Sequence, residues 1–159
     1  LIVSDSIVPL FENKIVLIVP KGSDKDISSF EDILKAETIA VGDPESVPAG
    51  QYAKEAFDNL SMWDDVAKKA SLGTNVTEVL NWVAEGSADA GIVYATDAAS
   101  NDKVSVVAEA PEGSVSKVIY PVGIVKETSK QESAKSFIEF LNSDEALAIF
   151  ERYGFTPNK

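Results

Sequence analysis

"KIVLIVP", residues 14 to 20, indicates what kind of sheet this chain builds. Ile15 to Val19 is an unbroken run of β-branched residues and leucine, and the turn-forming segment "PKGSDKD" closes it. A run without polar alternation is typical of a strand that is buried on both faces. The stretch therefore predicts a sheet that helices cover.

Candidate helices and strands alternate along the rest of the chain. Helical patterns cover "SSFEDILKA" (28–36), residues 49–60, "MWDDVAKKA" (62–70), residues 75–86, residues 131–141 and a last segment capped by Ser143. Strand patterns cover "TIAVG" (38–42), "AGIVY" (90–94), "KVSVVAEA" (103–110) and "KVIYPVGIVK" (117–126). Pro121 in the last of these favours an edge strand or a bend. The alternation predicts an α/β protein.

Composition excludes several classes of function. The 159 residues are 45% apolar, which is enough for a core, and 26 acidic against 14 basic residues give a net charge of -12. Such a charge disfavours binding to nucleic acid or to an anionic membrane surface. The chain has no histidine and no cysteine, which removes thiol nucleophiles, histidine acid/base catalysis and most zinc or copper sites. Common catalytic motifs are also absent, so an enzyme is disfavoured.

Two predicted helix starts are candidate binding elements. "SVPAG" puts Pro48 near the first helical position, where its missing N–H costs nothing, and the small side chains of Ala49 and Gly50 would let a ligand approach the backbone. "TNVTEV" puts Asn75 at the N-cap with Glu78 three residues later, the pattern of a capping box. A helix N-terminus exposes unpaired N–H groups and can bind an anion without a cationic side chain.

Tyr94 is a third candidate, because it ends the strand "GIVY". Binding residues gather at the carboxyl ends of strands in open α/β sheets, and a phenol can donate one hydrogen bond. The alternative for all of these positions is structural: two well-capped helices and a half-buried tyrosine. The residues alone leave both interpretations open.

Three segments together carry a family resemblance: "GDPESVPAGQYAKEAF", "NVTEVLNWVAEGSADAGIVYATDA" and "YPVGIVK…FIEFLNSDEALAIFERYGF". In this order, over nearly all of the chain, they resemble the extracytoplasmic molybdate-binding proteins of bacterial molybdate ABC transporters. The resemblance implies a two-lobed periplasmic binding protein fold of type II that closes on molybdate or tungstate. It also implies a membrane permease as partner, a location in the periplasm or on a cell-surface lipoprotein, no catalysis, no cofactor and no directly coordinated metal.

The resemblance assigns roles to the candidate residues. In the family, two serines of the first lobe, two backbone amides of the second and a tyrosine hydroxyl hold the anion. The amides fall on Ala49 and Val76 and the hydroxyl on Tyr94, with Pro48, Gly50 and Asn75 in support. Arg152 lies in the last predicted helix, so no guanidinium is expected at this site. The alternative functions are a binding protein for another oxyanion such as sulfate, or the effector-sensing domain of a transcription regulator with the same fold.

The resemblance also implies how the chain is organised. Residues 1–19 would be a remnant of lobe one and the first crossover strand, residues 20–117 the second lobe, and residues 118–159 the second crossover strand and the C-terminal helices of lobe one. Family members carry a further segment, with both serines, ahead of the position where this sequence starts. Without it only three of the five donors remain, which predicts weak anion binding. The C-terminal helices would also expose apolar faces, which predicts a homodimer through residues 119–159.

Overall fold

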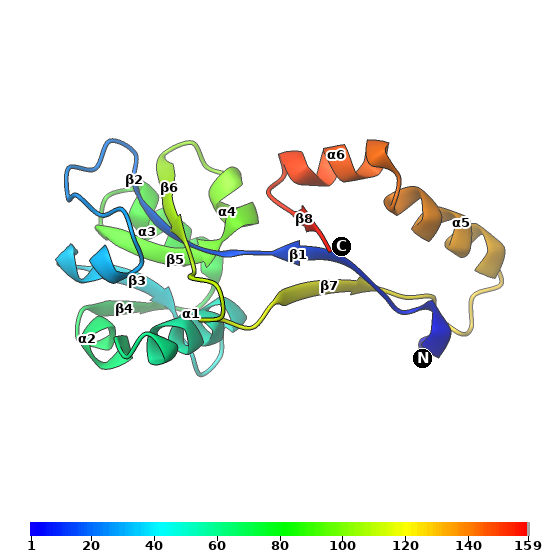
Figure 1. Cartoon of the computed structure of the whole chain (residues 1–159), viewed down its shortest axis with the longest axis horizontal. Coiled ribbons are helices and arrows are strands. Elements are labelled where there is room, and N and C mark those ends of the chain that lie inside the picture. The colour runs from blue at the N-terminus through cyan, green and yellow to red at the C-terminus, as the bar shows by residue number, and fades with distance from the viewer. Residues whose placement is uncertain (159) are drawn as a thin grey trace. The chain divides into compact units, whose positions relative to one another are not determined.

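A computed structural model describes residues 1–158, and the chain divides into two compact units. The first unit combines residues 1–13 with the residues from 117 onward, and the second unit is Lys14–Ser116 (Figure 1). We expected the second lobe to begin at residue 20. The second unit begins earlier because the strand Ile15–Pro20 pairs with two strands of that unit.

The second unit is built on a five-stranded sheet of order β4-β3-β5-β2-β6. Its strands are β2 (Ile15–Pro20), β3 (Ile39–Gly42), β4 (Ala70–Gly73), β5 (Ala90–Tyr94) and β6 (Val104–Glu109). Strand β3 runs parallel to β4 and β5, whereas β2 runs antiparallel to β5 and β6. Residues 15–19 are all buried, which confirms the prediction from their unbroken apolar run.

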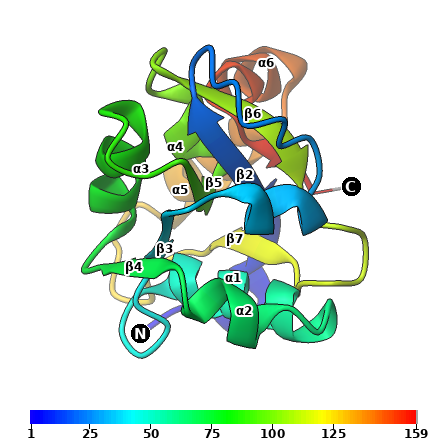
Figure 2. The same cartoon turned by 90° about the vertical axis from the view of Figure 1, so that its left-hand side faces the viewer.

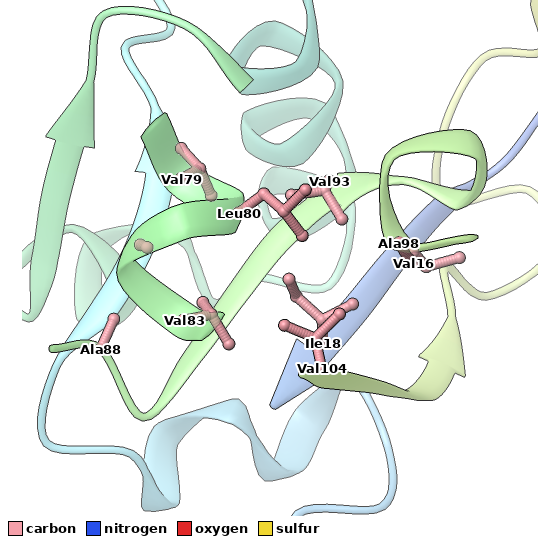
Figure 3. Packing of buried hydrophobic residues seen from close by; sticks show 10 residues of the cluster. Val16, Ile18, Val79, Leu80, Val83, Ala88, Val93, Ala98 and Val104 are labelled. Carbon is pink, nitrogen blue, oxygen red and sulfur yellow. The ribbon is translucent and has the colours of Figure 1, made fainter. Parts of the chain in front are cut away.

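Helices cover both faces of this sheet. Helices α3 (Val76–Ala84) and α4 (Ala95–Ala99) pack on one face, and α1 (Pro48–Asn59) packs on the other, with α2 (Trp63–Ala67) and the 3-10 helix η2 (Glu31–Lys35) beside it (Figure 2). Figure 3 shows Val79 and Val83 of α3 against the strands. Alternate residues of a strand face opposite sides of the sheet, so both faces contribute side chains to the hydrophobic core. Burial of each large apolar side chain stabilises the fold by about 1.5–3 kcal/mol.

Two expected elements differ in the structure. "SSFEDILKA" forms only the 3-10 helix Glu31–Lys35 instead of an α-helix. The helix expected over residues 62–70 ends at Ala67, and Ala70–Gly73 form strand β4, which we did not predict. This strand is short and contains no apolar run. Its parallel pairing with β3, from Ile39↔Ala70 to Gly42↔Gly73, decides its conformation.

The first unit contains a three-stranded antiparallel sheet of order β7-β1-β8. Its elements are η1 (Ser4–Ser6), β1 (Val8–Asn13), β7 (Val118–Val122), α5 (Gln131–Leu141), α6 (Asp144–Arg152) and β8 (Thr156–Pro157). Pro121 lies in an edge strand, as its missing N–H predicts. Helix α6 packs on β1: the ring centroids of Phe11 in β1 and Phe150 in α6 are 4.0 Å apart. No helix within residues 1–158 has both the length and the apolar content needed to cross a membrane.

Large apolar side chains remain exposed on the helices of the first unit. Phe137 and Phe140 of α5 are 58% and 46% exposed, and Tyr153 after α6 is 67% exposed. None of the residues of α5 is buried. The homodimer through residues 119–159 therefore stays a prediction.

Candidate functional site

A cavity of about 250 Å³ lies in the second unit, where three segments of the chain meet. Its lining residues are Ser46, Val47, Pro48, Ala49, Thr74, Asn75, Val76 and Tyr94. The structure therefore brings together the two helix starts and the strand end that the sequence singled out. Of the six candidate positions, only Gly50 is not in the lining.

The topology of the sheet explains why these segments converge. Strands β4, β3 and β5 are parallel neighbours, so their carboxyl ends lie at one edge of the sheet. The chain continues from β3 into α1, from β4 into α3 and from β5 into α4. Each connection therefore delivers the start of a helix to the same place.

Helix α1 begins at the cavity with Val47 as N-cap and Pro48 as its first residue. The loop before it is held by a hydrogen bond from the Val47 N–H to the Asp43 carbonyl oxygen, 2.8 Å long. As the second helical residue, Ala49 has an N–H without an intrahelical acceptor. This is the amide that the family resemblance assigns to the anion.

Gly50 has a packing role that the sequence did not reveal. A Cβ on this residue would lie 2.0 Å from the carbonyl oxygen of Gly42 and 2.5 Å from its carbonyl carbon. The missing side chain therefore lets α1 rest directly on the end of β3. Gly50 is buried and lies outside the cavity lining, so its expected role in admitting a ligand to the backbone stays a prediction.

Helix α3 begins at the cavity with Asn75 as N-cap, whose Oδ1 accepts a hydrogen bond from the Glu78 N–H at 2.9 Å. The other half of the expected capping box is shifted by one residue. Glu78 Oε2 accepts from the Thr74 N–H at 2.7 Å and from Thr74 Oγ1 at 3.0 Å. The carboxylate thus fixes the loop just ahead of the helix, and Val76 follows as the first helical residue.

Tyr94 is the last residue of β5 and the N-cap of α4. Its ring meets the ring of Tyr52 from α1 edge-on, with 6.4 Å between the centroids. The Tyr94 N–H donates a hydrogen bond to Asp97 Oδ2 at 3.2 Å. Burial raises the pKa of the Asp97 carboxyl above its ordinary value, although the hydrogen bond from Tyr94 acts in the opposite direction.

The lining of the cavity is electrically neutral. None of its eight residues carries a charged side chain. The partial positive charge comes from the N-termini of α1 and α3, which have 12 and 9 residues. Arg152 is not among the lining residues, and its Nε donates to the Ala148 carbonyl oxygen at 3.3 Å. Within residues 1–158 no cluster of acidic residues could hold a metal ion.

Three lining residues stand in the motifs "SVPAG" and "TNVTEV" but were not named as candidates: Ser46, Val47 and Thr74. Each lies within two residues of a helix start that the sequence did reveal. Extending both helix starts backward by two residues would have found them.

A mixed sheet covered on both faces, with helix starts meeting at the carboxyl edge of its parallel strands, defines a solute-binding domain of the periplasmic binding protein type. The chain belongs to the bacterial extracellular solute-binding proteins, whose family model matches residues 1–156.

Relatives of known name agree with this assignment. A Bacillus subtilis protein provisionally named an ABC transporter substrate-binding lipoprotein, YvgL, is 50% identical over 147 residues, which cover 92% of this chain and 56% of the relative. The molybdate-binding protein ModA of Escherichia coli is 41% identical over 153 residues, covering 92% of this chain and 59% of that protein. The chain thus spans less than two thirds of the length of these curated relatives.

A solved structure from Clostridium difficile, provisionally described as the substrate-binding domain of a molybdenum ABC transporter, superposes with a TM-score of 0.91. It is 40% identical, and the match covers 100% of this chain and 69% of that one. The agreement extends over both units of the chain.

Proposed function

We propose that this chain is the anion-holding part of an extracytoplasmic protein that captures molybdate or tungstate and delivers it to the membrane permease of an ABC transporter. The observation that carries the proposal is the meeting of two helix N-termini and Tyr94 at one neutral cavity. A relative that is 41% identical and is named for molybdate binding supports this ligand.

The cavity suits a small dianion for a physical reason. Backbone N–H groups of Ala49 and Val76 and the hydroxyl of Tyr94 would donate to three oxygens of a tetrahedral anion, while the helix dipoles offset its charge. The net charge of -12 would slow the encounter of the two partners more than it would weaken the bound complex.

The expected affinity of the cavity alone is low. A hydrogen bond to a charged group contributes about 1.5–3 kcal/mol, so three of them contribute roughly 4.5–9 kcal/mol. Lost translational and rotational freedom costs about 4–15 kcal/mol. Tight binding therefore requires donors beyond those of this cavity.

Calorimetric titration of the natural protein with molybdate, tungstate, sulfate and phosphate tests the proposal. We expect molybdate and tungstate to bind more tightly than the other two anions. Because sulfate has the same charge and shape but is smaller, tighter binding of sulfate would show that the site is built for a smaller oxyanion.

Tyr94→Phe provides a second test at the level of one donor. Loss of one hydrogen bond to a charged ligand should weaken molybdate binding by about 1–3 kcal/mol. Tyr52→Phe is the matched control, because Tyr52 packs against Tyr94 but is not in the cavity lining. Equal affinities of the two variants would show that the Tyr94 hydroxyl does not contact the ligand.

A further inference from the structure

The half-buried carboxyl of Asp97 lies at the backbone of Tyr94. Asp97 is the third residue of α4, and its Oδ2 accepts the Tyr94 N–H at the corner where β5 turns into α4. We propose that Asp97 is a positioning residue, which holds the backbone of Tyr94 so that the phenol stays at the cavity. This inference rests on the proposed function, in which that phenol contacts the anion.

The cost of placing a carboxyl here indicates that it has a task. Burial disfavours the charged form of Asp97, and what favours that form is the backbone N–H of Tyr94 and not a cation. A negative charge next to an anion-binding residue is also electrostatically unfavourable. As the third residue of α4, Asp97 forms part of a capping box with Tyr94, so the hydrogen bond to the Tyr94 N–H is the property that the aspartate supplies.

Tyr94 is held from two directions. Asp97 accepts a hydrogen bond from its backbone N–H, and the Tyr52 ring packs against its own ring with 6.4 Å between the centroids. The next residue is fixed as well, because the Ala95 N–H donates to the Lys14 carbonyl oxygen at 2.9 Å. Hydrogen bonds between oxygens span only about 2.5–3.0 Å, so a small displacement of the phenol would lose its bond to a ligand.

A related arrangement, shifted by one residue, occurs at the neighbouring segment of the cavity. Glu78, the third residue of α3, accepts the Thr74 N–H at 2.7 Å just ahead of that helix. In both places an acidic side chain of the first helical turn binds a backbone N–H at the cavity edge. The two carboxylates therefore bind backbone N–H groups at the site, while the lining itself stays neutral.

Three variants of the natural protein test the inference by calorimetric titration with molybdate. Asp97→Ala should weaken binding about 5- to 20-fold, the effect of losing one hydrogen bond. Asp97→Asn keeps an acceptor oxygen, so its affinity should stay within about 3-fold of the wild type. In a Tyr94→Phe background the effect of Asp97→Ala should nearly vanish, because both changes act through one hydroxyl. Full additivity of the two changes, or unchanged binding by Asp97→Ala, would overturn the inference.

Asp89→Ala is the matched control for a merely structural effect. Asp89 immediately precedes the other end of β5, and its Oδ2 accepts the backbone N–H groups of Glu37 and Thr38 at 2.8 and 3.2 Å. This variant should lower stability and leave molybdate affinity unchanged. If it weakens binding as much as Asp97→Ala does, the effect of Asp97 is one of general stability.

A ligand-free readout separates this inference from the proposed function. The ring protons of Tyr94 sense the ring current of Tyr52, so their NMR shifts report where the phenol lies. Asp97→Ala should move these shifts, and Asp97→Asn should restore them. If the Tyr94 shifts do not move in Asp97→Ala, the positioning role of Asp97 is overturned. If the shifts move but the wild-type protein binds no molybdate, the positioning role stands and the proposed molybdate-binding function is refuted.

Discussion

Gly50→Ala adds a single methyl group where α1 rests on β3. The new Cβ would lie 2.0 Å from the Gly42 carbonyl oxygen, and real Cβ atoms essentially never approach closer than 3.0 Å. Helix and strand must therefore separate by about 1 Å, the difference between these distances. Overpacking costs about 1–3 kcal/mol, and alanine recovers up to about 1 kcal/mol of helix propensity. A backbone carbonyl cannot rotate away, so the overpacking cost lies at the upper end, about 3 kcal/mol, and the net loss is about 2 kcal/mol.

Urea denaturation of the 159-residue chain, followed by tryptophan fluorescence, measures this loss. Both tryptophans, Trp63 and Trp82, lie in the second unit, so the signal reports on the unit that contains the cavity. With a slope of about 1–3 kcal/mol per molar urea, the midpoint should fall by roughly 1 M. Gln51→Ala and Gln51→Gly are the controls, because residue 51 is the next position of α1 and is exposed. The difference in stability between these two variants measures the helix propensity of alanine relative to glycine in this helix.

The outcome of Gly50→Ala decides between two roles for this glycine. Wild-type stability, or a gain of about 0.5–1 kcal/mol as propensity alone predicts, would refute the close packing of α1 on β3. If molybdate binding were nevertheless lost, Gly50 would have the role first expected for it, that of admitting the ligand to the helix backbone.

Asn75→Ala removes the acceptor of the Glu78 N–H and should lower the free energy of unfolding by about 0.5–2 kcal/mol in the same urea denaturation. Ser143→Ala removes the cap of α6 in the first unit and should leave the fluorescence midpoint unchanged. Because burial raises the pKa of Asp97, the native state holds this proton more tightly than the unfolded state. Its contribution to stability is full below the ordinary aspartate pKa of about 3.9 and is lost as the pH rises through the raised pKa. Asp97→Asn should remove this dependence of stability on pH, which a series of denaturation curves at different pH values would measure. Light scattering of the chain should show a dimer or larger species that depends on residues 119–159, and a monomer would refute this.

Local chemistry made part of this structure predictable. The unbroken apolar run of β2 needs burial on both sides wherever the strand lies. Pro48 and Asn75 mark helix starts through their own backbone and side-chain groups, and the helices begin where they predict. The two helix starts and Tyr94 could be recognised because each depends on a few consecutive residues.

Contacts through space account for what the sequence did not reveal. Strand β4 has no apolar run, and its pairing with β3 makes it a strand. The reason for Gly50 lies in a carbonyl group eight positions earlier, which only the folded chain brings near. The bond between Glu78 and Thr74 likewise depends on the geometry of a loop, since the sequence pattern predicted a partner one residue later.

The discontinuous first unit sets an order for folding during synthesis. Asn13 Nδ2 donates to the Tyr120 hydroxyl across 107 residues, and Phe11 pairs with Pro157 in the sheet. A ribosome releases the whole second unit before these partners of β1 exist. That unit can fold first. Its first and last strands along the chain, β2 and β6, pair with each other, so the folded unit brings the two flanking segments together and shortens the loop that β1 and β7 must close. Until then Leu10 and Phe11, which are buried in the finished fold, stay in water. This is the interval in which the nascent chain is most exposed to aggregation and to chaperones.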